Sequence, residues 1–277
     1  MYPGPNQVRT LDAGETGGAG GCERVTAAAS IRSTPRRRVV LLLSGAAGYL
    51  DAVSYLALGL FTANMTGNTV LLGLFAGEGR WSAAVRAFLA LASFFAGAAA
   101  AAAATRRASR LAGVLAAESG VLVSALLYWA FVLGHPRDPV REPGVFALIA
   151  LLSGAMGVQS AAVRRVGELR ISTTYVTGTL TSLATDLGAD VLARLGGRRR
   201  RGSPQAYDPG SRLLAGVWGS YLVGAVAGGL GQLRWGAWAV AVPVAMLLAM
   251  ATWDAAGTGL SGRGAPAATD PGGDPGR

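Results

Sequence analysis

Gly48-Tyr-Leu-Asp51-Ala-Val-Ser-Tyr55, followed by Phe61-Thr-Ala-Asn64-Met-Thr66-Gly67-Asn68-Thr69, is the stretch that decides the fold. It begins inside a long apolar run, places a carboxylate in that run, and then becomes polar and glycine-bearing before the chain turns apolar again. Backbone groups cannot be left unpaired in hydrocarbon, so an irregular polar segment at membrane depth must be buried in protein or line a cavity. The stretch therefore predicts a membrane helix followed by a broken segment.

A second copy of this pattern occurs in the other half of the chain. Three matches relate the halves: Ser44-Gly45-Ala46-Ala47-Gly48 with Ser153-Gly154-Ala155-Met156-Gly157, Thr66-Gly67-Asn68 with Thr177-Gly178-Thr179, and Ser93-Phe-Phe-Ala-Gly97-Ala98 with Ser220-Tyr-Leu-Val-Gly224-Ala225. The chain therefore reads as two copies of one membrane unit, each with its own broken segment.

The composition of the 277-residue chain indicates a membrane protein. It is 51% hydrophobic and 14% charged, whereas about a quarter of the residues of a soluble domain are charged. The net charge of +10 does not indicate a nucleic-acid partner, because the arginines cluster beside apolar runs, as basic residues flanking membrane helices do. The single cysteine, Cys22, excludes an intrachain disulfide framework, and the single histidine, His135, falls in a loop.

A helix needs about 20 apolar residues to span a bilayer. Six stretches qualify, at roughly 39–60, 84–105, 111–133, 144–163, 212–232 and 236–253. Two further segments, roughly 62–78 and 171–193, start too polar for ordinary spans and are either full crossings or re-entrant half-helices. Residues 1–37 and 255–277 lack apolar periodicity and are expected to be disordered tails.

The placement of arginine favours re-entrant segments. If both segments are re-entrant, one side of the membrane collects Arg36 to Arg38, Arg106, Arg107, Arg110, Arg164, Arg165, Arg170, Arg194, Arg198 to Arg201 and Arg212. The other side then keeps only Arg80, Arg86, Arg137, Arg141 and Arg234. Basic residues favour the cytoplasmic side, so we expect a bacterial plasma (inner) membrane protein with both termini in the cytoplasm. Two full crossings would instead place the Thr105–Arg110 loop outside.

This topology predicts the symmetry. Residues 38–134 and 144–254 each contain three spans, an odd number, so the second copy is upside down relative to the first. The predicted fold is an all-α membrane protein with six transmembrane helices plus two broken or re-entrant segments, arranged as two inverted three-span repeats. Many secondary transporters have this architecture. Small residues four apart, Ser93/Gly97/Ala101 and Ser220/Gly224/Gly228, predict close helix packing.

Several of these motifs resemble the signature of the YoaK-like family of bacterial membrane proteins, a family of unknown function. The resemblance is carried by Gly48-Tyr-Leu-Asp51-Ala-Val-Ser-Tyr, Asn64-Met-Thr66-Gly67-Asn68-Thr69, Gly157-Val-Gln159-Ser160-Ala-Ala, Thr173-Thr174 and Thr177-Gly178-Thr. It covers roughly residues 38 to 255 and implies a multi-span inner-membrane protein without supplying a substrate. An asparagine often follows the glutamine in that family, and Ser160 stands there in this chain, which weakens a ligand role for Ser160.

Asp51 is the first candidate site residue, because a charge in mid-span costs about 2.5–3.5 kcal/mol on insertion scales. It is either a proton- or cation-coupling group, a partner of an arginine, or a structural acceptor for the neighbouring broken segment. Gln159 is expected to face it across the pseudo-two-fold axis. Glu118 is a second candidate titratable site, with pairing to Arg107 or Arg110 as the alternative.

The remaining candidates are amides and hydroxyls where the half-helices begin: Asn64, Thr66, Asn68, Thr173, Thr174 and Thr177. Helix N-termini present free N–H groups that suit anions. The alternative is that these side chains only cap their own helices.

Three functions remain open. The chain has no phosphate-binding loop, no metal-ligand spacing and no catalytic Ser/His/Asp set, so we expect no enzyme and no cofactor. The first hypothesis is a secondary transporter or exporter of a small molecule or ion, the second a channel of the same architecture, and the third a non-transporting scaffold or sensor. Membrane lipid is an expected partner, and a homo-oligomer is left open.

Overall fold

The computed structural model describes residues 34–105, 111–134, 142–166, 184–185, 188 and 209–256. The elements in these ranges are all helical: α2 (Thr34–Leu58), α3 (Met65–Gly77), α4 (Trp81–Thr105), α5 (Leu111–Leu127), the π-helix η1 (Tyr128–Leu133), α6 (Gly144–Val166), α8 (Pro209–Trp235), the 3₁₀-helix η2 (Gly236–Val240) and α9 (Ala241–Ala255). The predicted all-α class is confirmed for this part of the chain. Nearly all of the second broken segment, including Thr173, Thr174 and Thr177, lies outside the described residues, as do most of both predicted tails.

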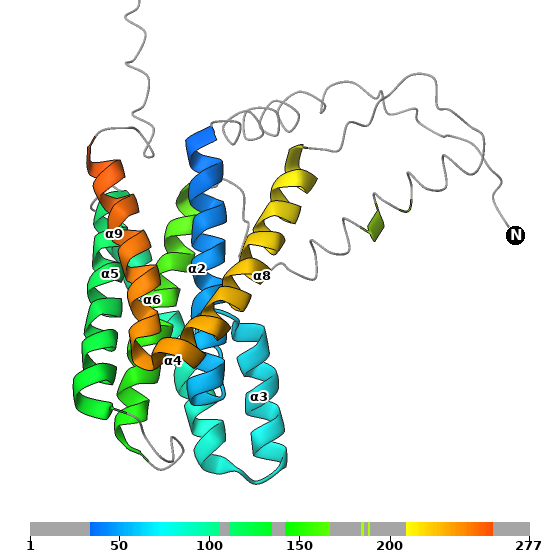
Figure 1. The fold of residues 1–277 in the computed structure, drawn as a ribbon. Coiled ribbons are helices and arrows are strands. Elements are labelled where there is room, and N and C mark those ends of the chain that lie inside the picture. The colour runs from blue at the N-terminus through cyan, green and yellow to red at the C-terminus, as the bar shows by residue number, and fades with distance from the viewer. Residues whose placement is uncertain are drawn as a thin grey trace, which may run out of the picture.

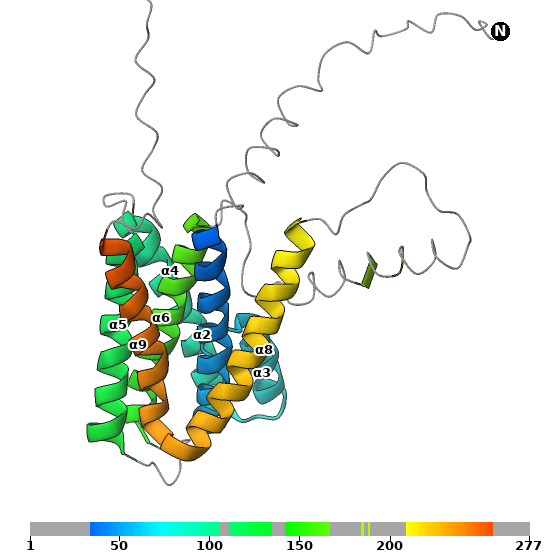
Figure 2. The same cartoon turned by 45° about the horizontal axis from the view of Figure 1, so that its top comes forward.

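Five described helical stretches are long and apolar enough to cross a membrane: Arg37–Leu58, Trp81–Ala104, Ala112–Leu133, Gly144–Ala161 and Leu213–Ala255. The fifth contains 43 residues and comprises α8 from Leu213 onward, η2 and α9. Figures 1 and 2 show the chain turning back at η2, so that α9 runs antiparallel to α8. The protein is therefore a multi-pass membrane protein.

The helices run in two opposed directions. In Figures 1 and 2, α2, α5 and α8 run from the upper end of the bundle to the lower, whereas α4, α6 and α9 run upward. α3 is shorter, lies beside the lower part of α2, and ends where α4 begins (Figure 1). Its 13 residues rise about 20 Å, less than the roughly 30 Å hydrocarbon core, so α3 by itself is too short to span a bilayer.

Glycines bring α2 and α8 into backbone contact. A Cβ added at Gly48 would strike the carbonyl oxygen of Tyr221, and Cβ atoms at Gly224 and Gly228 would strike the carbonyls of Gly45 and Tyr49. Lipid tails are as apolar as leucine, so helices in a bilayer associate through such close packing and interhelical hydrogen bonds.

Two serine hydroxyls also join this pair. Ser44 Oγ donates to the carbonyl of Val217 at 2.8 Å, and Ser220 Oγ donates to the carbonyl of Leu41 at 2.6 Å.

The pair α4 and α6 repeats this contact. A Cβ at Gly97 would strike the carbonyl of Gly154, and one at Gly157 would strike the carbonyl of Phe94. The small residues that the sequence predicts to pack closely therefore do so in both pairs.

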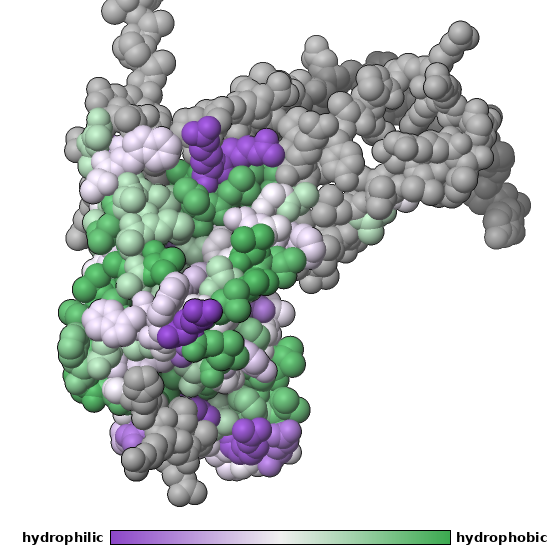
Figure 3. All heavy atoms as spheres, viewed as in Figure 1, coloured by the Kyte–Doolittle hydropathy of each residue, from purple (hydrophilic) through white to green (hydrophobic). Residues whose placement is uncertain are grey.

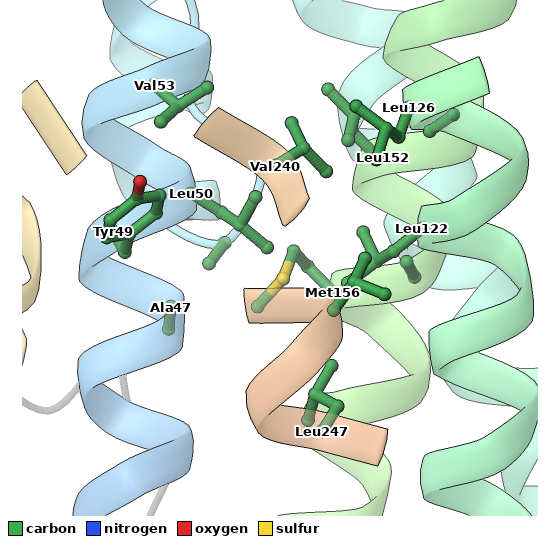
Figure 4. Close-up of a cluster of buried hydrophobic side chains, with 14 of the residues drawn as sticks. Ala47, Tyr49, Leu50, Val53, Leu122, Leu126, Leu152, Met156, Val240 and Leu247 are labelled. Carbon is green, nitrogen blue, oxygen red and sulfur yellow. The ribbon is translucent and has the colours of Figure 1, made fainter. Parts of the chain in front are cut away.

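Apolar side chains fill the space between α2, α5, α6 and α9. Figure 4 shows Leu50 of α2, Leu122 of α5, Met156 of α6 and Leu247 of α9 converging there, and all four are almost completely buried. The outside of the bundle is also apolar: Figure 3 shows hydrophobic residues over much of one side. Exposed aromatic and aliphatic side chains of this kind suit contact with lipid.

Candidate functional site

Asp51 of α2 is the centre of a buried hydrogen-bond cluster and is only 2% exposed. Its Oδ1 accepts from the backbone N–H groups of Thr62 at 2.8 Å, Ala63 at 2.6 Å and Asn64 at 3.3 Å. Its Oδ2 accepts from the Tyr221 hydroxyl at 2.5 Å. A carboxylate is an acceptor only, with room for about four bonds, so these four neutral donors satisfy it without a cation.

The chain reaches this cluster by doubling back. α2 continues for seven residues past Asp51, to Leu58, which is about 10 Å of rise. Gly59 then turns the chain with a φ of 72°, a value that favours glycine. Because Thr62 bonds Asp51, the chain has returned to the level of Asp51 before α3 begins.

Two asparagines stabilise the start of α3. Asn64 is its N-cap, and its Oδ1 accepts from the N–H of Gly67 at 3.1 Å. The Asn68 amide bonds both backbone groups of Phe61: it accepts from the N–H at 2.9 Å and donates to the carbonyl at 2.6 Å. Asn64 therefore caps α3 and Asn68 fixes the segment before it, while Thr66 is exposed in the first turn of α3.

The structure brings Asp51, Asn64 and Asn68 together but places Gln159 elsewhere. Gln159 Nε2 donates to the carbonyl of Leu43 at 2.6 Å. Leu43 precedes Asp51 by eight residues on α2, about 12 Å of rise. Gln159 is thus bound to α2 roughly two turns away from the Asp51 cluster.

Glu118 of α5 is also separate from this cluster. It is completely buried, and neither of its carboxyl oxygens has a hydrogen-bond partner among the described residues. The two arginines expected as alternatives, Arg107 and Arg110, lie outside the described residues.

Sequence reasoning missed two polar contacts. Tyr221 bonds Asp51 across 170 residues of chain, and the available signal was its hydroxyl at the position where the matching motif has Phe94. Asp254, near the end of α9, accepts from the backbone N–H of Ala112 at 2.8 Å and so caps α5. Its signal was a carboxylate directly after an apolar run.

The donor set around Asp51 suits a negatively charged oxygen, because three backbone N–H groups and a hydroxyl converge on one carboxylate. A metal ion has no comparable site in the part of the chain that the structure describes, where no group of three or more His, Cys, Asp or Glu side chains gathers. The strength of these hydrogen bonds depends on the charge of Asp51, because protonation would remove part of its acceptor capacity.

Comparison with known proteins agrees with the motifs. The family described as "Protein of unknown function (DUF1275)" matches residues 39–253. The UPF0700 transmembrane protein YoaK of Bacillus subtilis (strain 168) is 36% identical over 154 residues, which cover 55% of this chain and 67% of that protein. No solved structure matches. The resemblance to a YoaK-like family is thereby confirmed, and the chain belongs to this family of membrane proteins of unknown function.

Proposed function

We propose that the protein is a secondary transporter or exporter of a small solute, with its site at the membrane midplane between two broken helices. The observation that carries this proposal is the Asp51 carboxylate. It joins the irregular segment before the half-helix α3 to Tyr221 of α8, within a span where a charge is costly. Broken helices whose N-termini meet at the midplane are how many transporters build their sites.

The proposal divides the helices into two inverted repeats of three spans: α2, α4 and α5, then α6, α8 and α9. Its support is the matching of the close pairs, because α2 packs on α8 through glycines as α6 packs on α4. Further support comes from direction, since α2 and α6 run oppositely in Figures 1 and 2, as inversion requires.

We place the upper end of the bundle in Figure 1 in the cytoplasm of a bacterial cell, and with it both ends of the chain. The support is the arginine count: the connections at that end contain most of the chain's arginines, and basic residues favour the cytoplasmic side. The proposal includes no chemical reaction on the solute and no cofactor.

In this mechanism Asp51 acts as a latch, in the sense that its hydrogen bonds hold the first broken segment in place. While it is ionised, it stabilises the N–H groups of Thr62 to Asn64 in one position beside α8. Hydrogen bonds to charged groups contribute about 1.5–3 kcal/mol, so protonation or a competing anion would weaken four bonds at once. Releasing the latch would free the start of α3 to expose the amide groups to a solute.

The test is solute flux into proteoliposomes with and without a pH gradient, using the wild type and Asp51→Asn. We expect Asp51→Asn to abolish gradient-driven flux per folded molecule. Ser44→Ala is the matched control, since it removes a hydrogen bond between α2 and α8 away from the cluster and should keep its flux. Normal gradient-driven flux from folded Asp51→Asn protein would contradict the latch.

A non-transporting scaffold is the second candidate, and one observation favours it. The interior between α2, α5, α6 and α9 is filled with apolar side chains (Figure 4), whereas a transporter needs a polar cavity in at least one state. A folded wild-type protein that carries no solute under any gradient would favour this second reading.

A further inference from the structure

Glu118 and Asp51 differ in the hydrogen bonds that their carboxyl groups receive, and such bonds affect where a proton binds. Asp51 receives four hydrogen bonds, whereas both oxygens of the completely buried Glu118 lack a partner among the described residues. A buried ionised carboxylate without donors costs several kcal/mol, and such a group takes up a proton instead. Glu118 therefore has the surroundings of a neutral acid, and Asp51 those of an anion.

A second acceptor lies in the same layer of the bundle. Glu118 precedes Leu122 by four residues on α5, and Gln159 follows Met156 by three on α6, about 6 Å and 4.5 Å of rise. Leu122 and Met156 lie close together in Figure 4, and α5 and α6 run oppositely, so both displacements point the same way along the bundle. Glu118 and Gln159 thus lie at about the same level of two packed helices, roughly one turn from that apolar cluster.

Gln159 is oriented so that its oxygen remains free. Its Nε2 donates to the carbonyl of Leu43, while its Oε1 is buried without a hydrogen-bond partner in the described part of the chain. The layer thus contains unsatisfied acceptors on both Glu118 and Gln159. A proton on one oxygen of Glu118 would make that oxygen a donor, and Gln159 Oε1 is an acceptor without a donor at about the same level of the bundle.

Few charged groups face this layer from the elements packed on α5. α9 contributes Asp254, whose carboxylate accepts from Ala112, six residues before Glu118. α6 has no titratable side chain between Gly144 and Ala161, and neither has η2. On α2, Arg37 and Arg38 are exposed. Within the described ranges, Glu118 forms no ion pair with a basic side chain.

We propose that Glu118 and Gln159 form a proton-binding site inside the bundle, separate from the Asp51 cluster. Glu118 gains one proton on a carboxylate oxygen and donates the resulting O–H to Gln159 Oε1. A proton fits this layer better than a metal ion, because hard cations take six or more oxygen ligands and the neighbouring side chains Leu115, Leu122 and Met156 are apolar. In a proton-driven transporter this would be where the driving ion binds, a step that rests on the proposed function.

The test reads the proton directly and does not depend on transport. Infrared spectra of the full-length protein in lipid vesicles at neutral pH should contain a carboxylic-acid C=O band that shifts in D₂O. We expect this band to be lost in Glu118→Gln and kept in Asp51→Asn. Glu78→Gln is the matched control, since it removes an exposed carboxylate that pairs with Arg80 and should leave the band unchanged.

A second variant keeps the test decisive if Glu118→Gln fails to fold. Gln159→Leu removes the acceptor, and the acid band should then persist at a shifted frequency. Absence of an acid band in the wild type, its retention in folded Glu118→Gln, its loss in Asp51→Asn, or an unshifted band in Gln159→Leu would overturn the proposal. Loss of the band on adding sodium or potassium chloride at constant pH would overturn it in favour of a metal cation. A confirmed band with no solute flux would instead leave the proton site standing and count against the transporter.

Discussion

At the scale of single residues, the two buried carboxyl groups meet opposite surroundings. Asp51 is surrounded by donors from the broken segment and from α8, and Glu118 by apolar side chains. Composition alone treats both as equivalent intramembrane acids. This difference is the basis for proposing a latch at Asp51 and a proton site at Glu118, and a separate substitution tests each proposal.

Tyr221→Phe should destabilise the protein. The substitution removes the hydroxyl that donates to Asp51 Oδ2, and a lost hydrogen bond to a charged group costs about 1.5–3 kcal/mol. Thermal unfolding in detergent should therefore show a lower Tm.

Tyr49→Phe is the matched control for this measurement. The Tyr49 hydroxyl is buried without a partner among the described residues, so its removal should leave Tm unchanged or raise it slightly. Equal losses in the two variants would show that the Tyr221 hydroxyl contributes nothing specific.

At the scale of elements, the close pairs α2–α8 and α4–α6 depend on glycine, whereas α3 depends on its cap. The first dependence is steric, because an added methyl group would overlap a backbone carbonyl that cannot move independently. The second is electrostatic, because the first N–H groups of any helix need acceptors from outside it. Substitutions in the glycine contacts and in the α3 cap should therefore affect stability in different ways.

Gly48→Ala and Gly157→Ala should each lower the stability of the fold by about 1–3 kcal/mol or more. In both variants the new Cβ meets a carbonyl of the partner helix, of Tyr221 or Phe94. Gly113→Ala is the control, since nothing lies within 4 Å of its added Cβ, and alanine favours the helix by about 0.4–1 kcal/mol. Unfolding in denaturant would measure all three, and a loss confined to one pair would refute equivalent packing.

Asn64→Ala should loosen α3 while sparing the rest of the bundle. The lost cap bond to Gly67 costs about 1 kcal/mol of helix stability. Hydrogen exchange should accelerate in the first turn of α3 and stay unchanged in α4. Uniformly faster exchange across both helices would mean that α3 does not open independently.

At the scale of the whole molecule, the alternation of helix directions separates two ends of different charge. The turn between α3 and α4 lies at the lower end in Figure 1, and the end of α9 at the upper. The proposed orientation therefore places these two points on opposite sides of the membrane.

Single cysteines should report this orientation. In a Cys22→Ser background, Glu78→Cys should react with an impermeant thiol reagent in intact cells, whereas Ala256→Cys should react only after permeabilisation. Arg80 pairs with Glu78 at the surface, so the substitution costs little. Labelling of both positions from outside would contradict the re-entrant topology.

The sequence predicted the helical class and the closeness of Asp51 to the first broken segment, because a lone mid-span carboxylate next to a polar break has few other acceptable partners. It did not predict Tyr221, since a contact across 170 residues depends on which helices pair. Nor did it place Gln159 correctly relative to Asp51 along the bundle. One residue turns a helix face by about 100°, so a match between motifs does not determine which side chains meet.

The match between the two close helix pairs is incomplete, because the α2–α8 pair has a hydrogen bond between polar side chains at positions where the α4–α6 pair lacks it. Counting from Gly48 and Gly157, the positions of Asp51 and Tyr221 are taken in the other half by Ser160 and Phe94. The seam between α2 and α8 therefore has a buried polar tie, while at those positions the seam between α4 and α6 has a ring without a hydroxyl. On our proposal of two inverted halves, a two-fold rotation about an axis in the membrane plane would therefore not exchange the two seams. We therefore expect the α4–α6 seam, which lacks this hydrogen bond, to separate more readily than the α2–α8 seam.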